Sequence, residues 1–119
     1  MIYLTLIVAL FSLQASNEVE IRIANQSRVT LEDVRVEFAS QKESYGTIET
    51  GKATEYRVVK RAYRYARIEA LVDGKPALLQ PIDYVGEEEL KPGRYTYVLK
   101  INKKASSEYD VLVLECRKD

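Results

Sequence analysis

The segment that most constrains the fold is residues 90–101, where a proline–glycine turn precedes a run of alternating side chains. Pro92 fixes φ at the first central position of a turn, and Gly93 supplies the positive φ that a type II turn requires at the second. After the turn, one parity holds Tyr95, Tyr97, Leu99 and Ile101. Alternation with a period of two is typical of a strand that buries one face. The segment therefore predicts a tight turn leading into a half-buried β-strand.

The same residues have the spacing of a tyrosine corner, Leu-x-Pro-Gly-x-Tyr. In that motif a tyrosine near the start of a late strand donates its hydroxyl to the backbone of the preceding connection. This hydrogen bond holds a Greek-key crossover in place. The motif predicts a β-sandwich and implies no chemistry.

Alternation recurs along most of the chain. We expect strands over residues 18–24, 34–38, 53–60, 65–72, 75–80, 94–101 and 109–116. The side chains expected to face the core include Val19, Ile21, Ile23, Val34, Val36, Phe38, Ala66, Ile68, Ala70 and Val72; in the third strand Tyr56 and Val58 share a side. Asp73-Gly74 is a type I′ hairpin signal. Residues 40–51 are interpreted as a polar connection, and the aliphatic run 111–114 predicts a last strand covered on both faces.

About seven short strands with turn signals between them are typical of two packed sheets. No segment outside the first fifteen residues has a competing helical period. We therefore expect an all-β fold, a two-sheet antiparallel sandwich that is immunoglobulin-like or transthyretin-like.

The composition excludes several classes of function but does not identify one. The chain of 119 residues has room for one core domain, and 46% apolar residues exclude a disordered chain. Lys plus Arg and Asp plus Glu each number 18, which disfavours nucleic acid as a partner. The chain has no histidine, the usual general base and the commonest metal ligand. We expect no enzymatic activity, no metal site and no cofactor.

Residues 1–16 form an apolar run that ends in small and polar residues, and 17–119 form the β domain. The run has the length of a signal-peptide core, although no Lys or Arg precedes it. Ser16 stands where a lipobox has its cysteine, so lipidation is not expected. We predict cleavage near Ala15, no stable membrane insertion afterwards, and a periplasmic, cell-surface or extracellular location. The alternatives are a buried first strand and an uncleaved anchor.

The lone Cys116 follows an aliphatic strand pattern. This pattern predicts that Cys116 is a small, buried, apolar side chain at the end of a strand. The alternative is an intermolecular disulfide. A catalytic thiol is not expected, because no histidine is present to lower its pKa.

The candidate binding residues form a basic, tyrosine-rich belt. We define this basic belt as Arg57, Lys60, Arg61, Tyr63, Arg64, Tyr65 and Arg67; Lys52 precedes it. Interleaved cations and aromatic rings suit a bound anionic or carbohydrate ligand. The alternative is a solvated strand face on which arginines stack over tyrosines and pair with glutamates.

Two further motifs have structural and functional interpretations. The acidic patch of Asp83, Glu87, Glu88 and Glu89 offers oxygen ligands for calcium, but its spacing matches no calcium loop and is typical of a solvated loop. Asn25-Gln26-Ser27 matches a glycosylation sequon, and we interpret it as a turn.

Several segments of the chain resemble those of a known group of proteins. Asn25-x-Ser27, 34–38 (VRVEF), 63–66 (YRYA), 79–86 (LQPIDYVG) and 92–97 (PGRYTY) are similar to segments of small exported proteins and lipoproteins of Bacteroidetes-type bacteria. The group has no assigned activity, so the resemblance implies an envelope location and a sandwich fold, and transfers no site residues. The Leu-x-Pro-Gly-x-Tyr element more distantly resembles transthyretin-like accessory domains.

These observations favour a non-enzymatic interaction or ligand-binding module of the bacterial envelope. The expected partner is an envelope protein or a glycan. Self-association into a homo-oligomer is compatible with such a module. The alternatives are a structural protein that pairs through its edge strands and a small inhibitor of an envelope hydrolase that presents residues 84–89.

Overall fold

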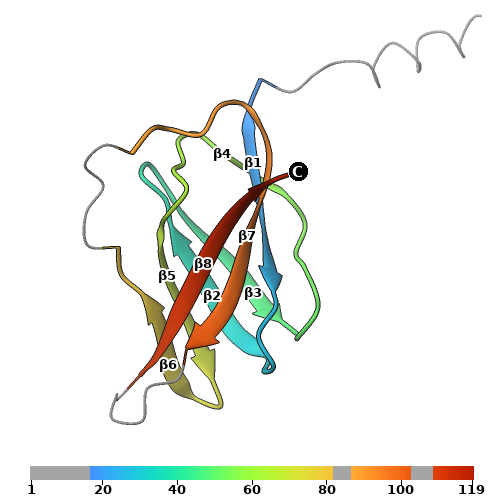
Figure 1. Ribbon diagram of the computed structural model, residues 1–119, viewed down its shortest axis with the longest axis vertical. Coiled ribbons are helices and arrows are strands. Elements are labelled where there is room, and N and C mark those ends of the chain that lie inside the picture. The colour runs from blue at the N-terminus through green and yellow to red at the C-terminus, as the bar shows by residue number, and fades with distance from the viewer. Residues whose placement is uncertain (1–16, 82–86, 103–108) are drawn as a thin grey trace, which may run out of the picture.

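Eight strands form a single mixed β-sheet in the computed structural model, which describes residues 17–81, 87–102 and 109–119 (Figure 1). The strands are β1 (Val19–Asn25), β2 (Leu31–Glu37), β3 (Lys42–Ile48), β4 (Arg57–Val59), β5 (Arg67–Val72), β6 (Lys75–Leu79), β7 (Gly93–Asn102) and β8 (Asp110–Lys118). Their order across the sheet is β3-β2-β5-β6-β8-β7-β1-β4. The described part of the chain contains no helix, and so none that could cross a membrane.

The sheet curls into a half-barrel. In Figure 1, β7 and β8 lie in front, and β2 and β3 lie behind them. The hairpin of β5 and β6 connects the two layers, because β5 pairs with β2 and β6 pairs with β8. The β6–β8 pairing is parallel and has two residue pairs, Ala77 with Asp110 and Leu78 with Val111. The interior of the curl is the hydrophobic core.

The prediction of a two-sheet antiparallel sandwich is wrong. The two layers belong to one continuous sheet, and two of its pairings are parallel: β6 with β8, and β1 with β7 over Val19–Asn25. The physical reason is that alternation determines which face of a strand is buried and not which strand lies beside it. Both architectures bury one face of every strand, so the same pattern fits both.

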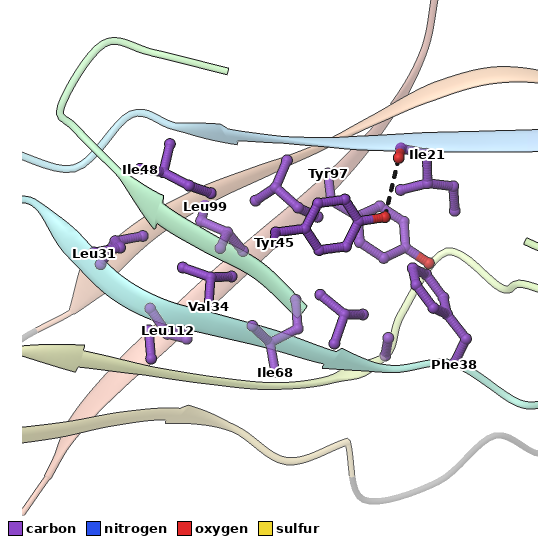
Figure 2. Packing of buried hydrophobic residues seen from close by; sticks show 14 of the residues in the cluster. Ile21, Leu31, Val34, Phe38, Tyr45, Ile48, Ile68, Tyr97, Leu99 and Leu112 are labelled. Carbon is purple, nitrogen blue, oxygen red and sulfur yellow. Dashed lines mark hydrogen bonds between the residues drawn. The ribbon is translucent and has the colours of Figure 1, made fainter. Parts of the chain in front are cut away.

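The faces predicted to be buried are confirmed for most strands. Ile21, Ile23, Val34, Ile68, Tyr97, Leu99 and Leu112 have no exposed surface and converge inside the curl, where Figure 2 shows many of them. The pattern on β1 and β5, buried at every second residue, is the one that the sequence predicts. Burying a side chain of this size contributes about 1.5–3 kcal/mol.

Side chains close the seam where the two edges of the curled sheet approach each other. We use "seam" for the boundary between β3 on one side and β1 with β4 on the other. Across it, the Tyr45 hydroxyl donates to the Ile21 carbonyl at 3.0 Å (Figure 2), and Asn25 Nδ2 donates to the Ile48 carbonyl at 2.8 Å. The side-chain amide of Gln41 donates to the Val58 carbonyl of β4 and accepts from the Lys60 N–H just after it. No backbone ladder joins β3 to β1 within the described ranges.

Strand β3 was not predicted, because residues 40–51 were interpreted as a polar connection. The pairing of β2 with β3 shifts register twice, and Gly46 adopts a φ of +75° within β3. A bulge of this kind interrupts strict alternation and leaves only Tyr45 and Ile48 buried. Because polar residues stand between Tyr45 and Ile48, the sequence of β3 does not alternate as a half-buried strand would.

Two other strands differ in detail from the prediction. β4 spans Arg57–Val59 instead of 53–60; its buried residue is Val59, and Val58 is 49% exposed. On β8, Val113 is 44% exposed, so the expectation that both faces of the last strand are covered is wrong. A single curled sheet provides no second layer to cover this outer face.

The tyrosine-corner hydrogen bond is confirmed, although the fold is not a sandwich. The Tyr95 hydroxyl donates to the Lys91 carbonyl at 2.7 Å. Gly93 has a φ of +146°, far from the value of about +80° in a type II turn. Its N–H donates to the Glu18 carbonyl at 3.0 Å, which aligns the start of β7 with β1. The Asp73-Gly74 turn has φ values of +50° and +77°, which confirms the type I′ prediction.

We expect Tyr95→Phe to lower the free energy of unfolding by about 1 kcal/mol. The ring stays in the core, and the hydrogen bond to Lys91 is lost. Urea denaturation of the variant and the parent protein measures the difference. A Tyr109→Phe variant is the control, because Tyr109 is 44% exposed and lies outside the connection before β7. Equal losses in both variants would contradict a specific role for the corner.

Candidate ligand-binding surface

The structure separates the basic belt into parts that point to different neighbours. Arg57 lies at the seam, where its guanidinium is 4.8 Å from the centre of the Tyr45 ring and 3.8 Å from the Glu43 carboxylate. Burial raises the pKa of Tyr45 well above its ordinary value, against the opposing effect of Arg57. The Lys60 N–H donates to Gln41 at 3.0 Å. This end of the belt is part of the seam closure.

Two other arginines of the belt are held by groups in late segments. Arg61 pairs with Glu89 at 2.5 Å and also donates to the Tyr63 hydroxyl at 3.3 Å. Arg64 donates to the backbone carbonyl of Cys116 at 3.1 Å. Burial raises the pKa of the Cys116 thiol. The prediction of a small buried residue at position 116 is confirmed, and the intermolecular disulfide stays a prediction.

The remaining belt residues, Tyr63, Tyr65 and Arg67, line one hollow of about 360 Å³. The other walls are Glu37, Phe38, Ala39 and Gln80. Tyr65 is 46% exposed, whereas Phe38 is buried and belongs to the core. The hollow therefore combines aromatic surface with a small set of polar groups, where β2 ends and β5 begins.

The polar groups of the hollow are organised around Arg67. Its Nε donates to Gln80 Oε1 at 2.7 Å, and its Nη1 pairs with Glu69 and lies 3.9 Å from Glu37. The hydrogen bond from Arg67 lowers the pKa of Glu69 below its ordinary range. Two carboxylates therefore balance the charge of this guanidinium. The hollow carries no excess positive charge.

Contacts with the core fix the backbone beneath the hollow. The buried Tyr97 hydroxyl donates to the Tyr63 carbonyl, and the Tyr97 ring lies 5.9 Å from the Phe38 ring, centre to centre. The Leu90 N–H donates to the Ala62 carbonyl at 2.8 Å. A segment without regular secondary structure thus has a fixed course, which preorganises the two tyrosines.

The acidic patch lies partly outside the described residues, because Asp83 is not among them. Glu89 pairs with Arg61, which is consistent with a solvated loop that is tied to a neighbour. In the part of the chain that the structure describes, no three His, Cys, Asp or Glu side chains are grouped as a metal ion would require. The predicted leader, residues 1–16, and the first half of loop 84–89 also lie outside the described residues.

Asn25 is a structural residue, and the turn interpretation of the sequon is confirmed. Its side chain has no exposed surface; Nδ2 donates to the carbonyls of Val29 and Ile48, both at 2.8 Å. Its Oδ1 accepts from the N–H of Ser27 at 2.9 Å and from the Ser27 hydroxyl. Both donors of the amide are used inside the fold, so the nitrogen is not accessible to a modifying enzyme.

A second polar cluster, on the outer face of β1 and β7, was not anticipated. The Asp119 carboxylate accepts from Thr96 and Tyr56, both at 2.6 Å, and the Tyr56 ring lies between Arg22 and Arg94 at 4.9 and 4.7 Å. Burial acts to raise the pKa of Asp119, but the hydrogen bonds from Thr96 and Tyr56 outweigh it and hold this pKa below the ordinary value. The cluster buries Thr96 completely. Its members come from four segments, which sequence spacing does not reveal.

The geometry defines a class of protein: a β half-barrel with an aromatic and polar hollow where β2 ends and β5 begins. No family model matches the chain, and no curated protein matches it. The fold is similar to the NMR structure of a protein from Eubacterium rectale, with a TM-score of 0.59 over 83% of this chain and 89% of that one. The two sequences are 9% identical, so the likeness concerns the fold alone.

Proposed function

We propose that the protein is a non-enzymatic, exported binding module whose ligand is an uncharged saccharide. The hollow formed by Tyr63, Tyr65 and Arg67 is the proposed site. The single observation that carries the proposal is the pairing of exposed aromatic surface with a fixed set of hydrogen-bonding groups there. The expectation of export rests on the apolar residues 1–16.

The chemistry of the hollow suits a sugar ring. The faces of tyrosine rings offer apolar surface for the C–H groups of a sugar, while Gln80, Arg67 and Glu37 can exchange hydrogen bonds with its hydroxyls. Aromatic walls with a few polar groups are typical of small-molecule sites. Arg67 and Gln80 are already held in place by contacts within the protein.

Charge decides between neutral and anionic ligands. Glu37 and Glu69 offset Arg67, and Arg61 and Arg57 are paired with carboxylates elsewhere. An acidic polymer would gain little from these three arginines, whose charge is already balanced, and would approach the Glu37 carboxylate in the wall of the hollow. We therefore prefer an uncharged saccharide to the anionic ligand that the basic belt alone would favour.

We expect Tyr65→Ala to weaken saccharide binding by about tenfold or more. The reason is that loss of one aromatic contact of about 1.4 kcal/mol corresponds to that factor. Tyr65 is 46% exposed, so the fold should be unaffected by its removal. The measurement is an NMR titration of isotope-labelled protein with a panel of neutral oligosaccharides and a matched panel of uronic-acid oligosaccharides.

Tyr109→Ala is the matched control, because Tyr109 is also exposed, at 44%, and does not line the hollow. It should bind the neutral oligosaccharides as the parent protein does. Binding of the acidic panel alone would contradict the neutral ligand. Binding that is unchanged in Tyr65→Ala would remove the hollow as the site.

A further inference from the structure

A second depression adjoins the hollow. Its volume is about 270 Å³, and it lies over β3, β2 and the start of β5. Glu37 and Arg67 line both the hollow and this depression, so the two are adjacent and share a wall. We call the second depression the strand subsite. Its lining also includes Arg35, Lys42, Ser44 and Glu69.

The register of three strands brings these side chains into two rows. On β2, Arg35 and Glu37 alternate with buried valines, so both point away from the core. Residues two apart on a strand are separated by about 7 Å, and one row therefore lies about one sugar unit beyond the other. The rows are Lys42, Glu37 and Arg67, next to the hollow, and Ser44, Arg35 and Glu69 beyond it.

Arg67 stands between the hollow and the strand subsite. Its Nε donates to Gln80 in the hollow, and its Nη1 pairs with Glu69 in the strand subsite. Glu69 in turn accepts a hydrogen bond from Arg35 Nη2 at 3.0 Å. This chain of bonds fixes polar groups of both depressions before a ligand arrives, which lowers the entropy cost of binding.

The strand subsite offers groups that suit the hydroxyls of a sugar. A guanidinium has five N–H donors, and the hydrogen bonds of Arg35 and Arg67 within the described ranges use only some of them. Lys42 and Ser44 are exposed and add an ammonium group and a hydroxyl. The aliphatic stems of the long cationic side chains provide apolar surface between the charges.

The charges that line the strand subsite are balanced, since three cations and three carboxylates contribute to it. A charged sugar would gain no net attraction there, whereas the hydroxyls of a neutral sugar can bond to groups of either sign. No aromatic side chain is among the described residues that line it. We therefore expect the strand subsite to add hydrogen bonds to a ligand whose apolar contacts lie in the hollow.

We propose, on the basis of the function proposed above, that the ligand is a neutral oligosaccharide of at least two units. One sugar ring lies against Tyr65 in the hollow, and the next lies in the strand subsite along β2. Glu37 and Arg67 contact the linkage between the units, because they line both depressions. The hollow alone, at about 360 Å³, is near the lower end of the range of about 300–1,000 Å³ that is typical of ligand pockets.

The test is an NMR titration of the isotope-labelled protein with glucose, mannose and galactose, and with the di-, tri- and tetrasaccharides of each. We expect the monosaccharides to shift the signals of residues at the hollow alone. The longer saccharides should also shift the signals of Arg35 and Ser44. The affinity should rise about tenfold from one unit to two or three, which corresponds to about 1.4 kcal/mol.

Ser44→Leu and Thr47→Leu are a matched pair of variants. Each replaces an exposed hydroxyl side chain of β3 with a bulkier apolar one, but Ser44 lines the strand subsite and Thr47 does not. Ser44→Leu should remove the gain in affinity from additional units and leave monosaccharide binding as in the parent protein. Thr47→Leu should keep the gain. Tyr65→Ala should weaken the binding of short and long saccharides alike.

Failure of the proposed function and failure of the longer ligand have different signatures. If no neutral saccharide of any length binds the parent protein, both proposals are wrong. Equal affinity for one unit and for four would overturn the oligosaccharide alone. The same conclusion would follow if longer saccharides left the signals of β2 and β3 unshifted, or if the gain with length persisted in Ser44→Leu.

Discussion

Asn25→Ala should destabilise the protein by about 3–5 kcal/mol, the largest effect expected from replacing one polar residue. The substitution leaves the Ile48 carbonyl without its donor and the Ser27 N–H without its acceptor, while the Val29 carbonyl and the Ser27 hydroxyl keep their bond to each other. Each buried group that loses its partner costs about 1–3 kcal/mol. A small domain has about 5–15 kcal/mol of stability in total, so the loss is a large fraction of it.

Urea denaturation followed by circular dichroism measures this effect. Ser27→Ala is the matched control, because it removes one hydroxyl from the same turn and leaves both carbonyls bonded to Asn25. We expect it to cost about 1 kcal/mol. A loss below 1 kcal/mol in Asn25→Ala would mean that the seam is not held by this side chain.

Tyr97→Ala should destabilise the protein by about 3–5 kcal/mol, because truncating a buried aromatic ring leaves a cavity that the core fills only in part. Tyr97 has no exposed surface and its ring lies against Phe38. Its hydroxyl also donates to the Tyr63 carbonyl beneath the hollow. The residue therefore contributes both to the core and to the proposed site.

Tyr97→Phe separates these two contributions. The ring remains, so the stability lost should be only about 1–2 kcal/mol. Because the backbone at Tyr63 loses its anchor, saccharide binding should weaken although no ligand contact is removed. Urea denaturation and the saccharide titration are measured on the same preparations. Equal stability of the Ala and Phe variants would contradict the role given to the ring.

The sequence predicted the strands in which alternation is unbroken. Ile21, Ile68 and Leu99 lie on the faces that period two assigns to them, and the Asp73-Gly74 turn has the predicted type. β3 was missed because the bulge at Gly46 disrupts the period. The architecture was predicted wrongly because the layers are joined by only two β6–β8 residue pairs. Hydrophobic alternation within each strand does not indicate which strand lies beside it.

The candidate site could be predicted only in part. Tyr63, Tyr65 and Arg67 are close in sequence and line one hollow. Phe38 and Gln80 complete it from other segments, and no spacing rule links them to the basic belt. Arg61 pairs with Glu89 and Arg64 donates to the Cys116 carbonyl, so neither arginine lines the hollow. Both partners are distant in sequence and could not be predicted from it.

The parallel pairing of β1 with β7 has a consequence for the order in which the chain acquires structure. Val19 pairs with Gly93 and Asn25 pairs with Leu99, so β1 has its main neighbour far along the sequence. Contacts so distant in sequence are slow to form, because a long loop must close before they are made. A nascent chain cannot complete its sheet until β7 and β8 have been synthesised, so β1 lacks its main neighbour until then.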